Sequence, residues 1–219
     1  KRQVMEYIEG ETLGALVGRL GAAPDYAHVL YPALCDAVGE LHAGFSMAGE
    51  TSVPVIHRDL KPSNIIVTGA SCTLDEGLTF SSLVIIDLGI ARVWRDGADA
   101  DTVKFGTRPY APPEQYGFGQ TSVRSDVYAL GALLFFCLTG VDPKPGIDMR
   151  EQCEARDIPT PLADAVCMSM ALDPVKPREY FESAPPTNEE SCTMCGKMCA
   201  VRTVNTIMDG LVIDLGDEY

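Results

Sequence analysis

The chain has 219 residues, of which 46% are apolar and 22% are charged, and its formal net charge is −14. This length and apolar content favour one sizeable folded domain with room for a small appendage, and they exclude wholesale disorder. Because so negative a surface repels phosphate backbones and anionic lipid headgroups, we expect neither nucleic acid nor a membrane as a partner of this segment.

The N-terminal part predicts a strand followed by two helices. Residues 3–8 (QVMEYI) have the composition of a strand, and residues 10–20 (GETLGALVGRL) predict a short helix that is capped near Thr12. Residues 26–44 place apolar side chains at helical spacing, which predicts an amphipathic helix. Pro32 lies in the early part of that helix and predicts a bend or a restart there.

The middle of the chain predicts short strands between loops. A loop leads into the β-branched segment Ile65–Val67, which predicts a short strand, and residues 71–82 predict a turn-rich connection. Residues 83–89 (LVIIDLG) predict a buried strand that ends in an acid and a glycine. Residues 91–125 are polar and rich in glycine and proline, which is typical of a long functional loop.

The C-terminal part predicts two helices and then a change of composition. Residues 127–140 form the longest apolar run, too short for a bilayer span of roughly 20 residues, so they predict a helix buried on every side. Residues 159–172 predict another helix. From about Pro174 the chain is rich in proline, charge and then cysteine. We therefore expect a mainly α fold with short β-strands over residues 1–175, and a short Cys-rich tail over 176–219.

Two loop segments, HRDLKPSN and IDLG, carry the polar groups that favour a specific chemistry. The first presents the carboxylate of Asp59, the ammonium of Lys61 and the amide of Asn64, and the second adds the carboxylate of Asp87 at the end of a strand. Such a set suits phosphoryl transfer: one acid orients a hydroxyl, the lysine stabilises the moving charge, and the other acid and the amide hold magnesium.

The motifs resemble the C-terminal lobe of eukaryotic-type serine/threonine protein kinases of the kind that bacteria carry. HRDLKPSN resembles the catalytic loop in its serine/threonine form, and DLG stands where that family usually has DFG. GTRPYAPPE resembles the end of the activation segment, SDVYALGALLFFCLTG the buried central helix, and MEYIEG the hinge that holds adenine. Their order and spacing agree with the family over about residues 3–175.

The resemblance implies roles for single residues in an enzyme that uses ATP and Mg²⁺ to phosphorylate serine or threonine on a protein substrate. Asp59 would be the catalytic acid/base, Lys61 would contact the transferred phosphate, and Thr107 would line the peptide site. Asn64 and Asp87 would be the magnesium ligands.

The same resemblance implies an adenine site and two structural roles. Glu6 and Ile8 would give backbone hydrogen bonds to adenine, and Ile66 would lie under its ring. Asp126 would tie the buried helix to the catalytic loop, and His57 would be a packed residue that supports the neighbouring acid rather than a base.

One departure from the family concerns the nucleotide. The glycine-rich loop, the strand lysine and the helix glutamate of the kinase N-terminal lobe would all precede residue 1, so we expect that lobe to be a missing partner of this segment. We therefore expect these 219 residues alone to bind ATP weakly or not at all and to be inactive. A non-catalytic, kinase-like binding module is the alternative.

The tail carries a second resemblance. Residues of about 170–208, with Cys192, Cys195 and Cys199, resemble the C-terminal end of phosphomethylpyrimidine synthase from thiamin biosynthesis, where three cysteines hold a [4Fe–4S] cluster that binds S-adenosylmethionine. Here the three thiols either bind such a cluster or belong to an idle tail, with zinc as a lesser alternative. The junction is either a natural fusion or an artificial join of two reading frames, and the join is favoured because no mechanism links the two chemistries.

The remaining cysteines indicate the compartment. Five are scattered singly through apolar or loop sequence, namely Cys35, Cys72, Cys137, Cys153 and Cys167. This pattern is typical of reduced thiols rather than of a disulfide framework, so the sequence predicts a cytoplasmic protein.

Overall fold

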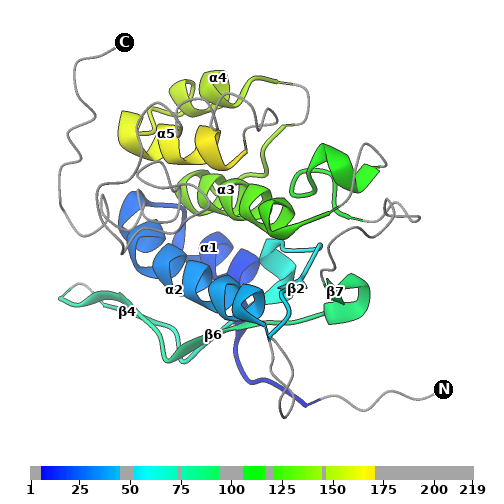
Figure 1. Cartoon of the computed structure of the whole chain (residues 1–219). Coiled ribbons are helices and arrows are strands. Elements are labelled where there is room, and N and C mark those ends of the chain that lie inside the picture. The colour runs from blue at the N-terminus through cyan, green and yellow to red at the C-terminus, as the bar shows by residue number, and fades with distance from the viewer. Residues whose placement is uncertain are drawn as a thin grey trace, which may run out of the picture.

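The computed structural model describes residues 6–44, 52–73, 75–93, 106–116, 121–144 and 147–170 (Figure 1). Its helices are α1 (Leu13–Leu20), α2 (Pro24–Ala43), α3 (Val123–Thr139), α4 (Met149–Glu154) and α5 (Thr160–Ser169). Its strands are β1 (Glu11–Thr12), β2 (Val55–Ile56), β3 (Ile65–Thr68), β4 (Ser71–Thr73), β5 (Gly77–Thr79), β6 (Ser82–Ile85) and β7 (Arg92–Val93). Single 3₁₀ turns occupy Pro62–Asn64, Leu88–Ile90 and Pro113–Tyr116. The described part is thus mainly helical with short strands, as the sequence predicts.

Helix α3 forms the centre of the fold. It lies between α2 on one side and α5 on the other, and α4 packs on α5 (Figure 1). Its apolar side chains are buried around nearly its whole circumference, as predicted for this run, and they include Leu130, Leu133, Leu134 and Phe135. In the part of the chain that the structure describes, no helix has the length and apolar character needed to cross a bilayer.

The helix ends follow local side-chain chemistry. Helix α1 begins after Thr12, whose hydroxyl accepts a hydrogen bond from Ala15 N at 3.1 Å, so the predicted cap is confirmed. Helix α3 begins with a reciprocal capping box between Ser122 and Ser125. Helix α2 runs as one element through Pro32, so the chain does not restart there.

Three short antiparallel sheets form one edge of the helical base. The largest has the order β1-β3-β6, in which Ile66 of β3 pairs with Thr12 of β1 on one side and with Val84 of β6 on the other. Strand β2 pairs with β7, and β4 pairs with β5. The first sheet therefore connects the segment before α1 with the two loops that carry the polar motifs.

The strand predictions are correct in part. The segment Ile65–Val67 forms most of β3, but the described part of the strand predicted at 3–8 has no regular structure, and the strand lies at β1 instead. The predicted connection 71–82 contains the β4–β5 hairpin, because Gly77 adopts the positive φ of 68° that its turn requires. The strand predicted over 83–89 is half-buried and ends at Ile85.

Candidate active site

The catalytic-loop motif is fixed to the centre of the fold by one buried carboxylate. Asp126, in the first turn of α3, accepts hydrogen bonds from His57 N at 2.8 Å and from Arg58 N at 2.9 Å. His42 Nε2 lies 2.9 Å from the same carboxylate. Because Asp126 is fully buried, these donors compensate for its desolvation and hold the loop against α3. The predicted link between the central helix and the loop is confirmed.

A buried histidine connects the two motif loops. His57 accepts a hydrogen bond from Asp59 N at Nδ1, over 3.2 Å, which leaves the proton on Nε2 for donation to Ile86 O at 3.0 Å. The His57 side chain is fully buried, so it is a packed structural residue, as predicted. It supports Asp87 indirectly, through its hydrogen bond to the carbonyl of the preceding residue, Ile86. A second link runs from Ile86 N to Asn64 O at 2.9 Å. The segments that carry the two predicted acids are therefore held together.

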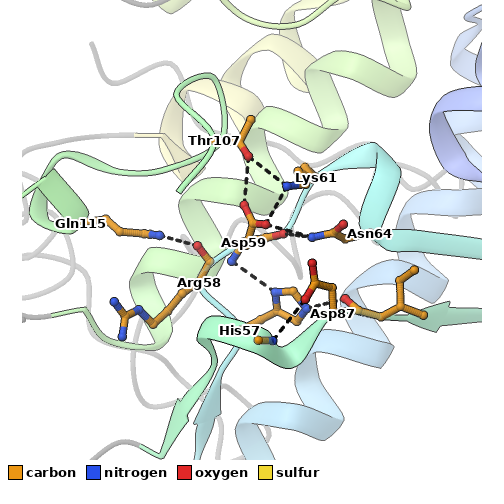
Figure 2. Close-up of polar contacts among 10 residues, drawn as sticks. His57, Arg58, Asp59, Lys61, Asn64, Asp87, Thr107 and Gln115 are labelled. Carbon is orange, nitrogen blue, oxygen red and sulfur yellow. Dashed lines mark hydrogen bonds and ion pairs between the residues drawn. The ribbon is translucent and has the colours of Figure 1, made fainter. Parts of the chain in front are cut away.

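Four predicted site residues form one polar cluster around Asp59 (Figure 2). Lys61 Nζ lies 2.7 Å from Asp59 Oδ2 and 3.2 Å from the hydroxyl of Thr107. That hydroxyl donates to Asp59 Oδ1 at 3.0 Å, and the amide nitrogen of Asn64 donates to Asp59 Oδ2 at 3.1 Å. The side chains of Asp59 and Lys61 keep 13% and 25% of their surface exposed, so a substrate can approach the cluster.

Two non-glycine residues in these loops adopt left-handed backbone conformations, Arg58 with φ of 72° and Asp87 with φ of 65°. Such conformations cost free energy and persist only where the surroundings enforce them. Arg58 is held at its nitrogen by Asp126 and at its carbonyl by the buried amide of Gln115. Gly106 makes room for this contact, since a Cβ there would lie 2.6 Å from Gln115 Nε2.

Asn64 and Asp87 offer oxygen ligands that fit a magnesium ion. Among the described residues, both hydrogen bonds of the Asn64 side chain use its nitrogen, so its amide oxygen is the atom that would serve as a ligand. Asp87 is exposed, and its Oδ1 accepts from Gly89 N at 3.3 Å. Figure 2 shows its carboxylate near Asn64, in agreement with the backbone link between their segments. Carboxylate and amide oxygens are the donors that Mg²⁺ prefers in proteins.

The residues predicted to hold adenine lie in the first sheet and in the segment that leads into it. Ile66 is half-buried in β3, and the chain before β1 runs close to it, since a Cβ on Gly10 would lie 2.8 Å from Ile66 Cγ2. Ile8 is half-buried and Glu6 is exposed, and neither belongs to a helix or strand. Their backbone groups are thus free of a sheet ladder at the positions where the kinase resemblance puts the hinge.

Cys192, Cys195 and Cys199 lie outside the described residues. Within the described ranges, no three side chains of His, Cys, Asp or Glu converge to hold a metal ion.

Sequence reasoning missed Gln115 and the contact of His42 with Asp126. Gln115 follows the APPE motif directly, but a single amide in a polar loop has no pattern that would reveal its buried partner. His42 lies one helical turn from Val38, on the side of α2 that faces the core, and this position is the one signal available in the sequence.

The comparisons with known proteins agree with this geometry. The family model for the protein kinase domain matches residues 3–202. This chain belongs to the protein kinase domain family. The kinase domain is 34% identical over 167 residues to the serine/threonine-protein kinase PknL of Mycobacterium tuberculosis, covering 74% of this chain and 37% of PknL.

Two further relatives are similar over a shorter stretch. The kinase domain is 33% identical over 147 residues to the serine/threonine-protein kinase PknB of Mycobacterium tuberculosis, which covers 65% of this chain and 20% of PknB. It is 32% identical over 142 residues to the serine/threonine-protein kinase A of Synechocystis sp., covering 64% of this chain and 26% of the relative. The matches thus span between a fifth and somewhat over a third of these relatives' length. They give no support to the resemblance to phosphomethylpyrimidine synthase.

Proposed function

We propose that this chain is the catalytic part of a serine/threonine protein kinase, which transfers the γ-phosphoryl group of ATP to a hydroxyl on a protein. The observation that carries the proposal is the hydrogen bond from the Thr107 hydroxyl to Asp59 Oδ1, with Lys61 bridging the same two groups. A hydroxyl thus already sits against the carboxylate, next to a cation, in the arrangement that phosphoryl transfer requires.

In the proposed reaction Asp59 orients the substrate hydroxyl and accepts its proton. A bond forms between the hydroxyl oxygen and the γ-phosphorus, and the bond from that phosphorus to the bridging β–γ oxygen breaks, which releases ADP. Lys61 lies 2.7 Å from Asp59, so its ammonium is placed to stabilise negative charge on the phosphoryl group as it moves. Thr107 lines the side on which the peptide binds.

Asn64 and Asp87 are the residues that would hold magnesium. The ion supplies charge neutralisation for the phosphates when it is bound. His57 fixes the distance between the two motif loops, because it binds Asp59 N and Ile86 O at once. The same histidine therefore keeps the proton acceptor and the metal ligand in register.

On the nucleotide side, we assign the adenine site to the backbone of Glu6 and Ile8 and to the side chain of Ile66. We further propose that residues 1–175 act as a kinase large lobe that needs a partner N-terminal lobe to grip the phosphates. A titration of the 219-residue chain with Mg-ATP tests the second point. Saturable binding at micromolar ATP would disprove the need for a partner lobe without affecting the catalytic assignment.

The catalytic assignment is tested with the protein expressed from its complete reading frame. Purified protein is incubated with labelled Mg-ATP and with peptides that present serine, threonine or tyrosine. We expect transfer to serine and threonine that falls by at least about 10²-fold in Asp59→Asn and persists in Asp75→Asn, a matched change at an exposed turn between β4 and β5. Undiminished transfer in Asp59→Asn, or protein that binds ATP and transfers nothing, would refute the proposal.

Residues 176–219 remain a separate Cys-rich tail in this proposal, although the kinase family model continues to residue 202 and so includes all three tail cysteines. A [4Fe–4S] cluster on Cys192, Cys195 and Cys199 is a prediction from the resemblance of this tail to phosphomethylpyrimidine synthase. Anaerobic reconstitution followed by an absorbance scan tests it, and a colourless product would disprove it.

We also propose a cytoplasmic location, supported by the five described cysteines, all of which are free thiols.

A further inference from the structure

Two cysteines on neighbouring helices face each other at the end of the fold remote from the catalytic loop. Cys153 lies on α4 and Cys167 on α5, the two helices pack directly, and an ion pair joins Arg150 of α4 to Asp164 of α5, three residues before each cysteine. Cys153 is fully buried and Cys167 is half-buried, and both are reduced. Of the other described thiols, Cys35 on α2 and Cys137 on α3 are buried, and Cys72 is exposed on β4.

We propose that Cys153 and Cys167 are a redox-modification site, at which a peroxide converts the two thiols into a disulfide that joins α4 to α5. This inference goes beyond phosphoryl transfer and does not depend on it, because none of the residues involved belongs to the cluster around Asp59. Its geometric basis is the packing of α4 on α5 and the Arg150–Asp164 ion pair, which lies one helical turn before each cysteine on the same faces of the two helices, since a disulfide requires two cysteines whose backbones are already close.

The environment assigns a different part of the reaction to each thiol. The hydrogen bond from Cys153 lowers the pKa of Cys167, against the opposing effect of burial, and the positive charge of Arg150 lowers it further. The same hydrogen bond, followed by burial, raises the pKa of Cys153. Because the thiolate is the nucleophile and Cys167 is also the more exposed sulfur, Cys167 reacts first and Cys153 resolves the product.

The chemistry balances with one peroxide for each disulfide. The Cys167 thiol loses its proton, the thiolate attacks one peroxide oxygen, and the O–O bond breaks to give a sulfenic acid. The other oxygen leaves as hydroxide and takes up the proton that Cys167 released, which gives water. The sulfur of Cys153 then attacks the sulfenic sulfur, the S–O bond breaks, and the departing hydroxide takes the Cys153 proton to form a second water. Two thiols are oxidised by two electrons, and the peroxide is reduced.

A bond at this place would fix more than the two helices. Gln152 precedes Cys153 and is buried, and its side chain binds the backbone of Lys144 and Ile147, at 2.7 Å to Lys144 N and 3.1 Å to Ile147 O. Arg156 follows on the same segment and lies over the ring of Phe135 in α3, 5.3 Å from its centroid. Oxidation would therefore anchor the connection after α3 as well as α4 itself.

Peptide mapping tests the proposal on the complete 219-residue chain. The chain is treated with dilute hydrogen peroxide, free thiols are alkylated, and the protein is digested with trypsin without reduction. Cleavage after Arg150 and Arg156 isolates Cys153 in peptide 151–156 and Cys167 in peptide 157–178, because Lys176 precedes a proline and is not cut. We expect these two peptides to be joined, with the loss of two hydrogens, in protein that runs as a monomer on a non-reducing gel.

Variants and hydrogen exchange complete the test. Cys167→Ser, which keeps a hydrogen-bonding group, should abolish the linked peptide and leave Cys153 open to alkylation, whereas Cys72→Ser should leave the linked peptide intact. In wild-type protein the oxidised form should show about ten-fold slower amide exchange in α4 than the reduced form. Recovery of separately alkylated 151–156 and 157–178 from wild-type protein, under conditions that oxidise the exposed Cys72, would overturn the proposal. Equal exchange rates in the two forms would overturn the claim that the bond restrains α4.

Discussion

Two regions of this kinase domain are held together by different forces. We call them the helical base, which is formed by the packed helices α2, α3, α4 and α5, and the loop edge, which is formed by the motif loops 57–64 and 86–89. In the base, α3 is buried between α2 and α5 and makes mainly apolar contacts (Figure 1). At the edge, the backbone of the motif loops adopts left-handed conformations at Arg58 and Asp87, and hydrogen bonds to the buried side chains of His57 and Asp126 hold it in place. Apolar packing supplies stability without a precise geometry, whereas the edge obtains a precise geometry from Asp126 and His57.

This contrast predicts the largest effect on activity from a residue that contributes little to stability. Asp59→Asn removes the proposed proton acceptor and should lower phosphoryl transfer by about 10²–10⁴-fold. Asparagine keeps the shape of the side chain and one oxygen acceptor for the Thr107 hydroxyl, so the free energy of unfolding should fall by no more than about 1–2 kcal/mol through weaker contacts with Lys61 and Asn64. Kinase assays and urea unfolding measure the two effects. A loss of more than about 3 kcal/mol in stability would show that the edge contributes to the stability of the fold as much as the base does.

Asp126 joins the two regions, and its removal should affect both. Asp126→Ala leaves the buried N–H of His57 and the partly buried N–H of Arg58 without an acceptor, at about 1–3 kcal/mol each, so the free energy of unfolding should fall by about 2–6 kcal/mol. Transfer activity should fall with it, because the catalytic loop loses its attachment to α3. Asp126→Asn keeps one oxygen acceptor and should cost less. If urea unfolding gave equal losses for the two variants, the carboxylate's hydrogen bonds would not be what holds the loop.

The same contrast explains how much the sequence could predict. Periodic apolar spacing placed α2 within a few residues, a continuous apolar run placed α3, and residues 159–172 were predicted as the helix that became α5. Thr12 marked the start of α1. These features depend on neighbours along the chain. The motif resemblance identified the cluster around Asp59. The ends of β1 and β6 were predicted wrongly. The two-residue pairing of β1 with β3 and the left-handed conformation of Asp87 after β6 are both decided by contacts from distant segments. The bond from Gln115 to Arg58 spans 57 positions and has no local pattern.

Packing in the base should respond to one added methyl group. A Cβ on Gly131 of α3 would lie 2.6 Å from Ser169 Cβ and 2.9 Å from Met170 Cγ, at the contact with α5. Gly131→Ala should therefore cost about 1–3 kcal/mol through overpacking, despite the better helix propensity of alanine. Gly39→Ala in α2 is the control, since nothing lies within 4 Å of its Cβ position, and it should gain up to about 1 kcal/mol. A gain at both positions in thermal unfolding would mean that α3 and α5 move apart easily.

The smallest predicted effect concerns Thr12, where the edge and the base meet within a single residue. Its backbone pairs with Ile66 in the first sheet, and its hydroxyl caps α1. Thr12→Ala should cost about 1 kcal/mol because Ala15 N loses its acceptor, while Thr12→Ser keeps the hydroxyl and should restore most of that loss. Urea unfolding of the three proteins separates the two roles: an equal cost for alanine and serine would mean that the strand pairing next to Ile66, rather than the helix cap, is what threonine stabilises at this position.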